Sequence, residues 1–314
     1  MRRSRCKLEF QVAVYHVFSR VVDRLFRFDD DTKNLFRDLI WKVSYFSGVE
    51  VITYAVMSNH FHILVRVQPK WTAVSKDEVV DRVKVLYGAI KEQRLKRKLE
   101  HLCEMGNSEE AEAILDSYRV RMNDVSEFMK TLKLRMTIGF NDKHDRVGTL
   151  WEGRFGSVLL EDTPNSELLR LVAAYIDLNP VRAKIVRDPA SYIWSGIGDA
   201  KRTKFKRSEW ARQGIASLYT DSSGQEILEY EKLLMARASK KGMAGHAKDI
   251  PGIHPLTSLH VRNVTFARGR AIGSQAFIME ATGGHPAGGI TICHNGEDGQ
   301  ILVAGQLTRR KRQS

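Results

Sequence analysis

The stretch VEVITYAVMSNHFHILVRV, residues 49–67, contains two runs of β-branched and aromatic residues separated by Ser58-Asn59. Such runs are typical of β-strands, and Ser and Asn favour tight turns. We therefore predict a strand over residues 49–57, a turn at 58–59 and a second strand over residues 60–67. The short connection indicates that the two strands pair as a hairpin.

The second of these strands begins with a pair of histidines. Successive side chains of a strand point to opposite faces, so His60 and His62 share one face with Leu64 and Arg66. The other face is apolar throughout and consists of Phe61, Ile63, Val65 and Val67. Two imidazoles at this spacing can bind one divalent cation. The alternative is a pair of half-exposed surface histidines beside a turn.

The segments around the hairpin predict an α+β protein. Alternating or apolar runs indicate strands, whereas apolar residues at spacings of three and four indicate helices. By these criteria strands are predicted over residues 11–20 and 155–161, and helices over residues 29–47, 76–138 and 166–178. Asp29-Asp30-Asp31-Thr32 is a plausible start for the first helix. The order of elements predicts a mostly antiparallel sheet covered by helices.

The helix predicted from residue 166 carries Tyr175 and, near its end, Asn179. Both lie on an apolar stripe, and Tyr175 alone can be a core tyrosine with its hydroxyl at the rim. Asn179 precedes Pro180, which suits an N-cap followed by proline at the start of a further helix. Alternatively, the helix continues through Asn179, whose amide oxygen then reaches the same cation as the histidines.

A tyrosine and a divalent cation together suit phosphoryl chemistry. The reference pKa of a phenol is about 10, so tyrosine attacks poorly without assistance. A cation on a phosphate neutralises charge, polarises the P–O bond and orients the phosphorus for in-line attack. His60 and His62 with one amide oxygen would hold such a cation and leave positions for phosphate oxygens.

Further motifs follow in a fixed order. The hairpin precedes Gly148-Thr149-Leu150-Trp151-Glu152-Gly153-Arg154-Phe155, then Tyr175-Ile176-Asp177-Leu178-Asn179-Pro180-Val181-Arg182-Ala183, then Tyr192-Ile193-Trp194-Ser195. Over residues 8–197 this set resembles the single-tyrosine HUH transposases of small insertion sequences, especially the branch related to REP-associated tyrosine transposases. A His-x-His pair alone is a weak signal, whereas the ordered set is specific.

The resemblance implies a ferredoxin-like antiparallel sheet with helices on one face, and a homodimer. It implies Mg²⁺ or Mn²⁺ dependence and cleavage of single-stranded DNA near a hairpin. By resemblance, Tyr175 is the nucleophile that forms a 5′-phosphotyrosine link, and His60 and His62 bind the metal. Asn179 stands where some relatives carry a third polar ligand. Rejoining by a 3′-hydroxyl then needs no external energy source.

Two regions of the sequence are additional to what a minimal member of that family contains. A mainly helical insertion is expected at about residues 76–125, within the domain at 8–197. Beyond it we predict a basic, partly helical linker region over residues 198–260, and a small C-terminal module over residues 261–314 that ends in a basic tail.

The charge balance points to a polyanionic partner. Lys and Arg number 50 against 37 Asp and Glu, which gives a net charge of +13. Nucleic acid is the usual partner of such a chain. Arg154 beside Trp151 is a candidate platform for phosphates and unpaired bases, unless Trp151 belongs to the core. A second candidate DNA-contact zone, or else a solvated linker, consists of Lys201, Arg202, Lys204, Lys206 and Arg207.

Membrane insertion and a disulfide framework are not expected. The sequence has no run of about 20 apolar residues. Cys6, Cys103 and Cys293 lie far apart, without the paired spacing of disulfides or zinc sites. A cytoplasmic protein is the expectation.

Three functional classes fit these observations. The first is a tyrosine transposase that nicks and rejoins DNA. The second is a domesticated, non-catalytic protein that binds hairpin DNA. The third is a metal-dependent hydrolase that activates water at the histidines, with Tyr175 structural. Retention of both histidines and the tyrosine favours the first.

Overall fold

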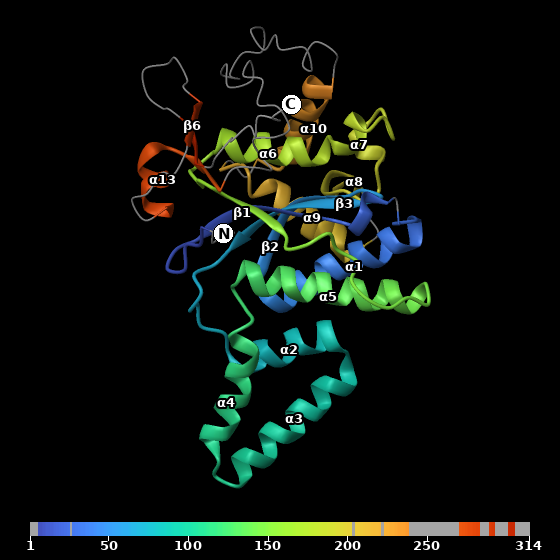
Figure 1. Ribbon diagram of the computed structural model, residues 1–314. Coiled ribbons are helices and arrows are strands. Elements are labelled where there is room, and N and C mark those ends of the chain that lie inside the picture. Colours follow the sequence, from blue (N-terminus) through green and yellow to red (C-terminus); the bar gives the residue numbers. More distant parts are fainter. Residues whose placement is uncertain are drawn as a thin grey trace, which may run out of the picture.

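One mixed β-sheet organises the molecule, which is represented by a computed structural model (Figure 1). The structure describes residues 6–25, 27–202, 205–220, 223–238, 270–282, 289–292 and 301–304. Within these ranges, seven strands form the sheet in the order β2-β3-β1-β4-β5-β7-β6. The predicted α+β class is confirmed.

The first four strands form the ferredoxin-like part of the sheet. They are β1 (Ala13–Arg20), β2 (Val49–Val56), β3 (His60–Val67) and β4 (Gly156–Leu160). β1 pairs antiparallel with both β3 and β4, and β2 pairs antiparallel with β3. The amide of Met57 donates to the carbonyl of His60 at 2.8 Å and closes the predicted hairpin. The antiparallel ferredoxin-like sheet is therefore confirmed, and β3 lies in its interior.

Helix α1 (Asp30–Ser47) covers the apolar face of the hairpin. It begins where predicted, because the Asp29 carboxylate accepts a hydrogen bond from the Thr32 amide at 2.7 Å. It ends at Gly48, whose φ of 64° is a left-handed conformation that favours glycine. Phe36 of α1 packs against Phe61 of β3 with ring centroids 4.8 Å apart. This face of the sheet is the main core.

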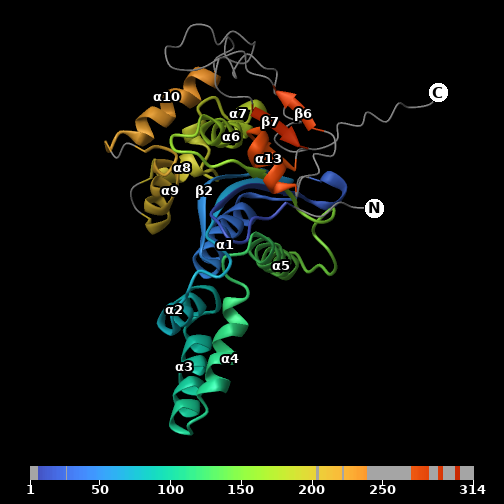
Figure 2. The same ribbon diagram turned by 90° about the vertical axis from the view of Figure 1, so that its left-hand side faces the viewer.

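Helix α5 (Val125–Lys143) lies beside α1. Figures 1 and 2 both show these two helices on one side of the sheet and helix α6 (Glu167–Asp177) on the other. The helices expected on one face are thus α1 and α5. The second face is covered by α6 and by parts of the C-terminal extension.

The extension contains short helices that pack around α6 and β2. They are α7 (Asn179–Arg182), α8 (Gly196–Ala200), α9 (Lys206–Ala216) and α10 (Glu226–Ala238). The Val56 amide donates to the carbonyl of Trp194 at 2.9 Å, so the chain before α8 covers part of the edge of β2. The 3₁₀ turn η2 (Pro189–Ser191) precedes α8, and a second 3₁₀ turn, η1 (Val22–Arg24), follows β1.

Three helices project from the body below α1 and α5 (Figures 1 and 2). They are α2 (Lys76–Tyr87), α3 (Ala89–Glu104) and α4 (Ser108–Arg119). A reciprocal pair of hydrogen bonds between Ser75 and Glu78 caps the first of them. These helices lie within the insertion predicted at about residues 76–125.

Residues near the C-terminus extend the same sheet. Strand β5 (Ala271–Gly273) pairs parallel with β4, and β7 (Ile301–Ala304) pairs antiparallel with β5 and with β6 (Gly289–Ile292). Helix α13 (Gln275–Ala281) lies beside them. The boundaries proposed at 197/198 and 260/261 stay predictions, and the basic tail after residue 308 and residues 239–260 of the linker region lie outside the described residues.

Within the described ranges, none of the helices combines the length and apolarity that a membrane span requires. Cys6 is buried and Cys103 is exposed, both as free thiols. Cys293 lies outside the described residues.

Candidate functional site

His60 and His62 lie on the face of β3 opposite Phe61, as the alternation of the strand requires. Their ring centroids are 5.3 Å apart and the rings are nearly perpendicular. Nδ1 of His60 lies 2.7 Å from Oδ1 of Asn59, the turn residue before the strand. His60 is half-buried, whereas His62 is only 7% exposed. The hairpin therefore orients the two imidazoles toward a common region.

A third histidine, His16 of β1, belongs to the same cluster. Its Nε2 lies 2.9 Å from Nδ1 of His62, and the two rings stack with centroids 5.0 Å apart. The antiparallel register places His16 opposite Leu64 and Phe18 opposite His62, so His16 approaches His62 diagonally. Sequence reasoning missed His16 because a lone histidine in a predicted strand is informative only once the partner strand and register are known.

The environment keeps the hairpin imidazoles neutral. Burial, together with the charge of Arg20, lowers the pKa of His60 to about 4. Burial and the neighbouring His16 lower the pKa of His62 well below its ordinary value. A neutral imidazole has a ring-nitrogen lone pair, which is the form that ligates metal ions.

Helix α6 brings Tyr175 to these histidines. Ser166 caps the helix, and its apolar face packs on the sheet. The ring of Tyr175 lies 5.8 Å from that of His62 and 6.0 Å from that of His16, in both cases edge-on. Tyr175 is 8% exposed, and burial raises the pKa of its phenol. Residues widely separated in the sequence thus form one cluster of three imidazoles and a phenol.

Arg182, from helix α7, lies against this tyrosine. Its guanidinium carbon is 4.9 Å from the centre of the Tyr175 ring, and its Nη1 donates to the Tyr175 carbonyl at 2.9 Å. The positive charge partly opposes the effect of burial on the pKa of the phenol. Arg182 belongs to the quoted motif but was not among the predicted site residues.

Asn179 does not cap helix α7 in the way that the sequence suggested. Helix α7 begins at Asn179 with Leu178 in the N-cap position, so the predicted N-cap role is wrong. The amide nitrogen of Asn179 donates instead to the carbonyls of Tyr175 and Ile176, at 2.9 and 3.1 Å. This contact closes the last turn of α6. A role for its amide oxygen as a metal ligand stays a prediction.

The two hairpin histidines could supply two of the ligands of a divalent metal ion. Nδ1 of each is engaged in a hydrogen bond, which leaves Nε2 of both imidazoles as the candidate ligand atoms. Among the described residues no group of three or more His, Cys, Asp and Glu side chains is arranged to hold a metal ion. A cation bound by His60 and His62 would therefore need other oxygens, as DNA phosphate and water provide.

Residues 10–103 match the family model described as Transposase IS200 like. This part of the chain, less than a third of its length, is therefore similar to the IS200-like transposases. The matched segment begins just before β1, ends one residue before the end of α3, and includes His16, His60 and His62. It ends before Tyr175, so the match itself assigns no role to the tyrosine. The family resemblance expected from the motifs is confirmed for this segment.

One similar solved structure is described as that of a REP-associated tyrosine transposase bound to a REP hairpin. It is 14% identical, with a TM-score of 0.40, and the alignment covers 66% of this chain and 90% of that chain. No curated protein matches the chain.

Trp151 of this protein is a core residue, which corrects the expectation that it stacks on DNA bases. It is 7% exposed and packs between Phe28, Phe36 and Phe61. Its indole nitrogen donates to the Lys133 carbonyl at 3.1 Å. Since a base has no access to this ring, only the exposed Arg154 remains as a candidate DNA contact in the motif.

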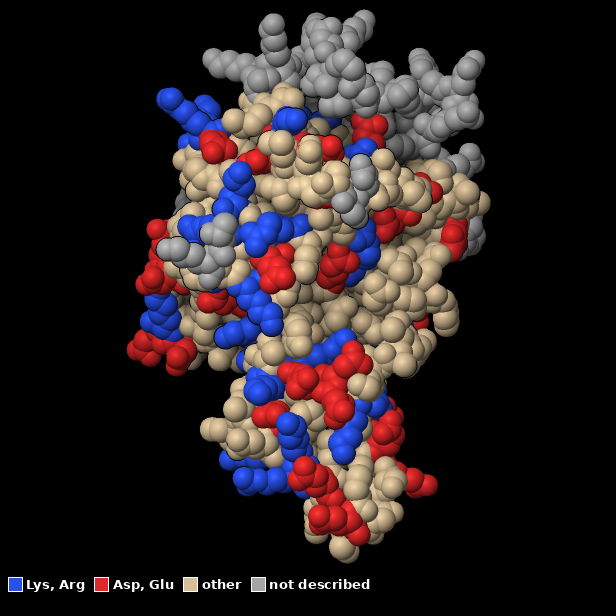
Figure 3. Space-filling model, turned by 180° about the vertical axis from the view of Figure 1, so that it is seen from behind, with Lys and Arg blue, Asp and Glu red and all other residues tan. Residues whose placement is uncertain are grey.

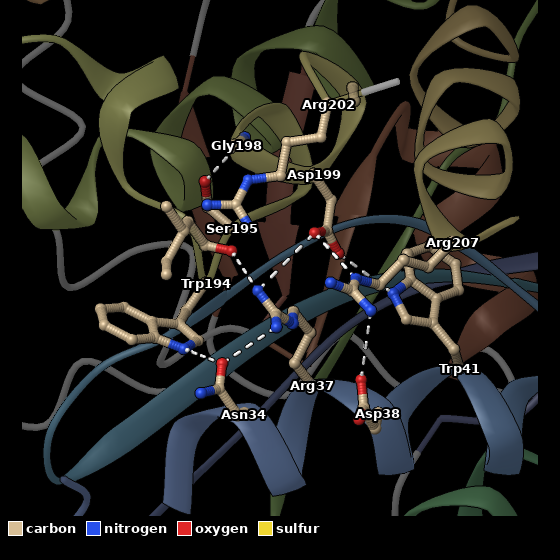
Figure 4. Close-up of polar contacts among 12 residues, drawn as sticks. Asn34, Arg37, Asp38, Trp41, Trp194, Ser195, Gly198, Asp199, Arg202 and Arg207 are labelled. Atoms are coloured by element: carbon tan, nitrogen blue, oxygen red, sulfur yellow. Dashed lines mark hydrogen bonds and ion pairs between the residues drawn. The ribbon is translucent and has the colours of Figure 1, made fainter. Parts of the chain in front are cut away.

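Arg207 is likewise internal to the fold, contrary to the prediction of a DNA contact. Its Nε donates to the fully buried carboxylate of Asp199 at 3.3 Å, and its Nη1 lies 3.6 Å from Asp38 (Figure 4). Arg37 and Trp41 of α1 approach the same Asp199 carboxylate. This network fastens α8 and α9 to α1, so the charge of Arg207 is already neutralised.

The other residues of the predicted basic zone differ from one another. Lys201 forms an ion pair of 3.0 Å with Glu231 of α10, and Arg202 is half-buried. Lys206 is exposed, with its ammonium 5.4 Å from the centre of the Trp210 ring. Lys204 lies outside the described residues. DNA contact by Lys206 and Arg154 stays a prediction.

The surface charge is mixed on the face opposite that of Figure 1. Figure 3 shows basic and acidic side chains interleaved over both the body and the projecting helices. The net charge of +13 is therefore not gathered into one continuous basic patch on this face.

Proposed function

We propose that this protein is a metal-dependent DNA strand transferase that cleaves and rejoins single-stranded, hairpin-bearing DNA through a 5′-phosphotyrosine intermediate. The observation that carries the proposal is the 5.8 Å separation between the rings of Tyr175 and His62. A tyrosine with a purely structural role could lie anywhere in the core, whereas the Tyr175 ring lies beside the imidazole of His62. The match of residues 10–103 to the IS200-like transposases supports the same reading.

In the proposed cleavage step, the phenolic oxygen of Tyr175 attacks the phosphorus of the scissile phosphodiester. The P–O bond to the 3′-oxygen breaks, the phenol loses its proton, and the leaving strand gains a 3′-hydroxyl. In the reverse step a 3′-hydroxyl attacks the phosphotyrosine and releases the phenol. One phosphodiester replaces another, so the bond energy is retained within the protein–DNA link.

Neutral His60 and His62 would hold the divalent cation, Mg²⁺ or Mn²⁺, through their Nε2 atoms. The chemistry that such a cation supplies is charge neutralisation and polarisation at the scissile phosphate. The other contributions to the reaction come from side chains of the protein. Arg182 places a positive charge over the phenol, which favours the phenolate both as attacking group and as leaving group.

The proposed substrate is unpaired DNA next to a hairpin. The net charge of +13 favours a polyanion, and Arg20 presents an exposed guanidinium beside His60, its partner across the β1–β3 ladder. A second subunit is proposed from the family resemblance. Both the homodimer and the hairpin specificity are parts of the proposal that DNA-binding and sedimentation measurements can test separately.

The burial of the tyrosine favours one competing function. A phenol that is only 8% exposed must be uncovered before DNA can reach it. A domesticated protein that binds hairpins without cutting them would need no such opening. Catalysis is preferred because a protein that only binds DNA has no need for imidazoles and a phenol within one cluster.

The discriminating experiment uses a 5′-labelled and a 3′-labelled hairpin oligonucleotide with Mn²⁺. A strand transferase forms a protein–DNA band that survives denaturant, and this band is absent in Tyr175→Phe. Tyr45→Phe is a matched control, since Tyr45 is 41% exposed on α1 and far from the cluster. Reversible binding with no adduct would support the non-catalytic protein. Cleavage that persists in Tyr175→Phe without an adduct would support a hydrolase.

A further inference from the structure

His16 is a fully buried polar side chain with no role in the proposed reaction so far. A buried imidazole is costly unless its ring nitrogens are satisfied by hydrogen bonds. Nε2 of His16 and Nδ1 of His62 lie 2.9 Å apart, which is within the normal range of hydrogen-bond distances. The question is which of the two rings donates the proton.

The neighbouring histidine indicates the answer. Nδ1 of His60 lies 2.7 Å from the side-chain oxygen of Asn59, and an amide oxygen can only accept. Nδ1 of His60 therefore carries the proton and Nε2 carries the lone pair. A cation held by the Nε2 atoms of both hairpin histidines requires the same tautomer of His62.

The two possible tautomers of the His16–His62 pair have opposite consequences. If Nε2 of His16 donates, His62 is protonated on Nε2 and cannot ligate a cation through that atom. If Nε2 of His16 accepts, Nδ1 of His62 carries the proton and Nε2 is left with its lone pair. We propose that His16 is a positioning residue that accepts this hydrogen bond and fixes His62 in the metal-binding tautomer.

The surroundings hold the pair in place. The ring of Phe18 lies 5.3 Å from His16 and 5.8 Å from His62, and the ring of Tyr175 closes another side. Phe18 can lie there because Gly156 stands opposite it on β4. A Cβ on Gly156 would come within 2.2 Å of the Phe18 ring. Water has little access to replace His16 as the partner of His62, since both imidazoles are buried.

This inference rests on the proposed metal site, and its test has a readout that needs no metal. Long-range ¹H–¹⁵N NMR of the ¹⁵N-histidine-labelled full chain, without added metal, reports the tautomer of each ring. The His62 signals are assigned by their absence in His62→Gln. We expect His62 to be protonated on Nδ1 in the wild type and in His16→Gln, whose amide oxygen can accept the same bond. We expect this tautomer to lose its preference in His16→Leu.

The second readout is the affinity for Co²⁺ alone, followed by its visible absorption. His16→Leu should weaken binding by about 10- to 100-fold, as loss of a hydrogen-bond partner of a ligating histidine usually does. His16→Gln should restore affinity toward the wild-type value. Phe18→Leu is the matched control, because it alters packing on the same His62 ring but removes no hydrogen bond.

The outcomes separate the two proposals. Protonation of wild-type His62 on Nε2, or unchanged Co²⁺ affinity in a folded His16→Leu variant, would overturn the role of His16 and leave the metal site intact. If wild-type protein binds no Co²⁺ through His60 and His62, the proposed metal site itself fails, whatever the tautomer. If His16→Leu does not fold, the comparison of His16→Gln with His16→Met decides, because methionine offers no comparable acceptor.

Discussion

The hydroxyl of Thr53, on β2, donates a hydrogen bond of 2.7 Å to the carboxylate of Asp177, on α6. The same fully buried carboxylate accepts from the hydroxyl of Tyr230 at 2.7 Å and from the amide of Ile197 at 3.2 Å. Burial raises the pKa of Asp177 to about 6. Because Tyr175 lies on the same last turns of α6, this network fixes the tyrosine helix relative to the hairpin that carries the histidines.

Removal of the Asp177 carboxylate should destabilise the fold strongly. Asp177→Ala leaves three buried donors without their acceptor, for a cost of roughly 3–5 kcal/mol. Thr53→Val removes one donor and leaves the other two contacts, for about 1 kcal/mol. Urea unfolding followed by circular dichroism measures both. Equal stabilities of the two variants would show that Asp177 is not the centre of the network.

Arg182 should assist the chemistry of Tyr175. Arg182→Met removes the positive charge and the buried cation–π contact with Tyr175. The substitution should therefore slow adduct formation roughly tenfold. Arg170→Met is the matched control, because Arg170 stacks at 5.4 Å on Tyr219, away from the histidines. Single-turnover adduct formation with excess protein gives both rates. The same loss of rate in the control would assign the effect to helix stability.

Substitutions of Trp151 and Arg154 should have different effects, the first on stability and the second on DNA binding. Trp151→Ala opens a large cavity in the core and should cost roughly 3–5 kcal/mol. Arg154→Ala should leave stability unchanged and, if Arg154 meets a phosphate, lower the slope of log affinity against log salt by about 1. Thermal unfolding and fluorescence anisotropy with a hairpin oligonucleotide make the comparison. A salt slope equal to that of the wild type would remove Arg154 from the DNA interface.

The cap of α1 should make stability depend on pH in acid. Hydrogen bonds from Thr32, with Lys143 nearby, lower the pKa of Asp29 to about 2. A carboxyl with a lowered folded pKa stabilises the fold above its unfolded pKa near 4, and this contribution is lost as pH falls toward 2. Asp29→Asn keeps a capping side chain but does not titrate, so its stability should fall less between pH 5 and pH 3.

Asp29→Ala completes that comparison, since it removes the cap at every pH and should cost about 1 kcal/mol. Urea midpoints of the three proteins at pH 3, 5 and 7 provide the data. If wild type and Asp29→Asn lose stability in parallel between pH 5 and pH 3, Asp29 does not contribute to the acid sensitivity.

Local sequence patterns were sufficient for the elements that position the site. The hairpin, the start of α1 at Asp29 and the helix that carries Tyr175 follow from spacing, turn residues and caps, which depend on neighbours in the chain. The contact of His16 with His62 depends on the register between β1 and β3, which single-strand patterns do not contain.

Charge and aromatic content were poorer guides to position. The sequence does not show whether an arginine faces DNA or a buried carboxylate, and Arg207 faces Asp199. Trp151 has the composition of a stacking platform but fills the core between α1 and β3. The parallel pairing of β5 with β4 joins segments too distant for any local pattern to specify.

The most direct test of the central claim is mass spectrometry of the protein–DNA adduct. After reaction with a hairpin oligonucleotide and Mn²⁺, the complex is digested with protease and nuclease. The account predicts one modified peptide, with a nucleotide joined through its 5′-phosphate to the oxygen of Tyr175. A covalent link at another residue, or cleaved DNA with Tyr175 unmodified at every time point, would contradict it.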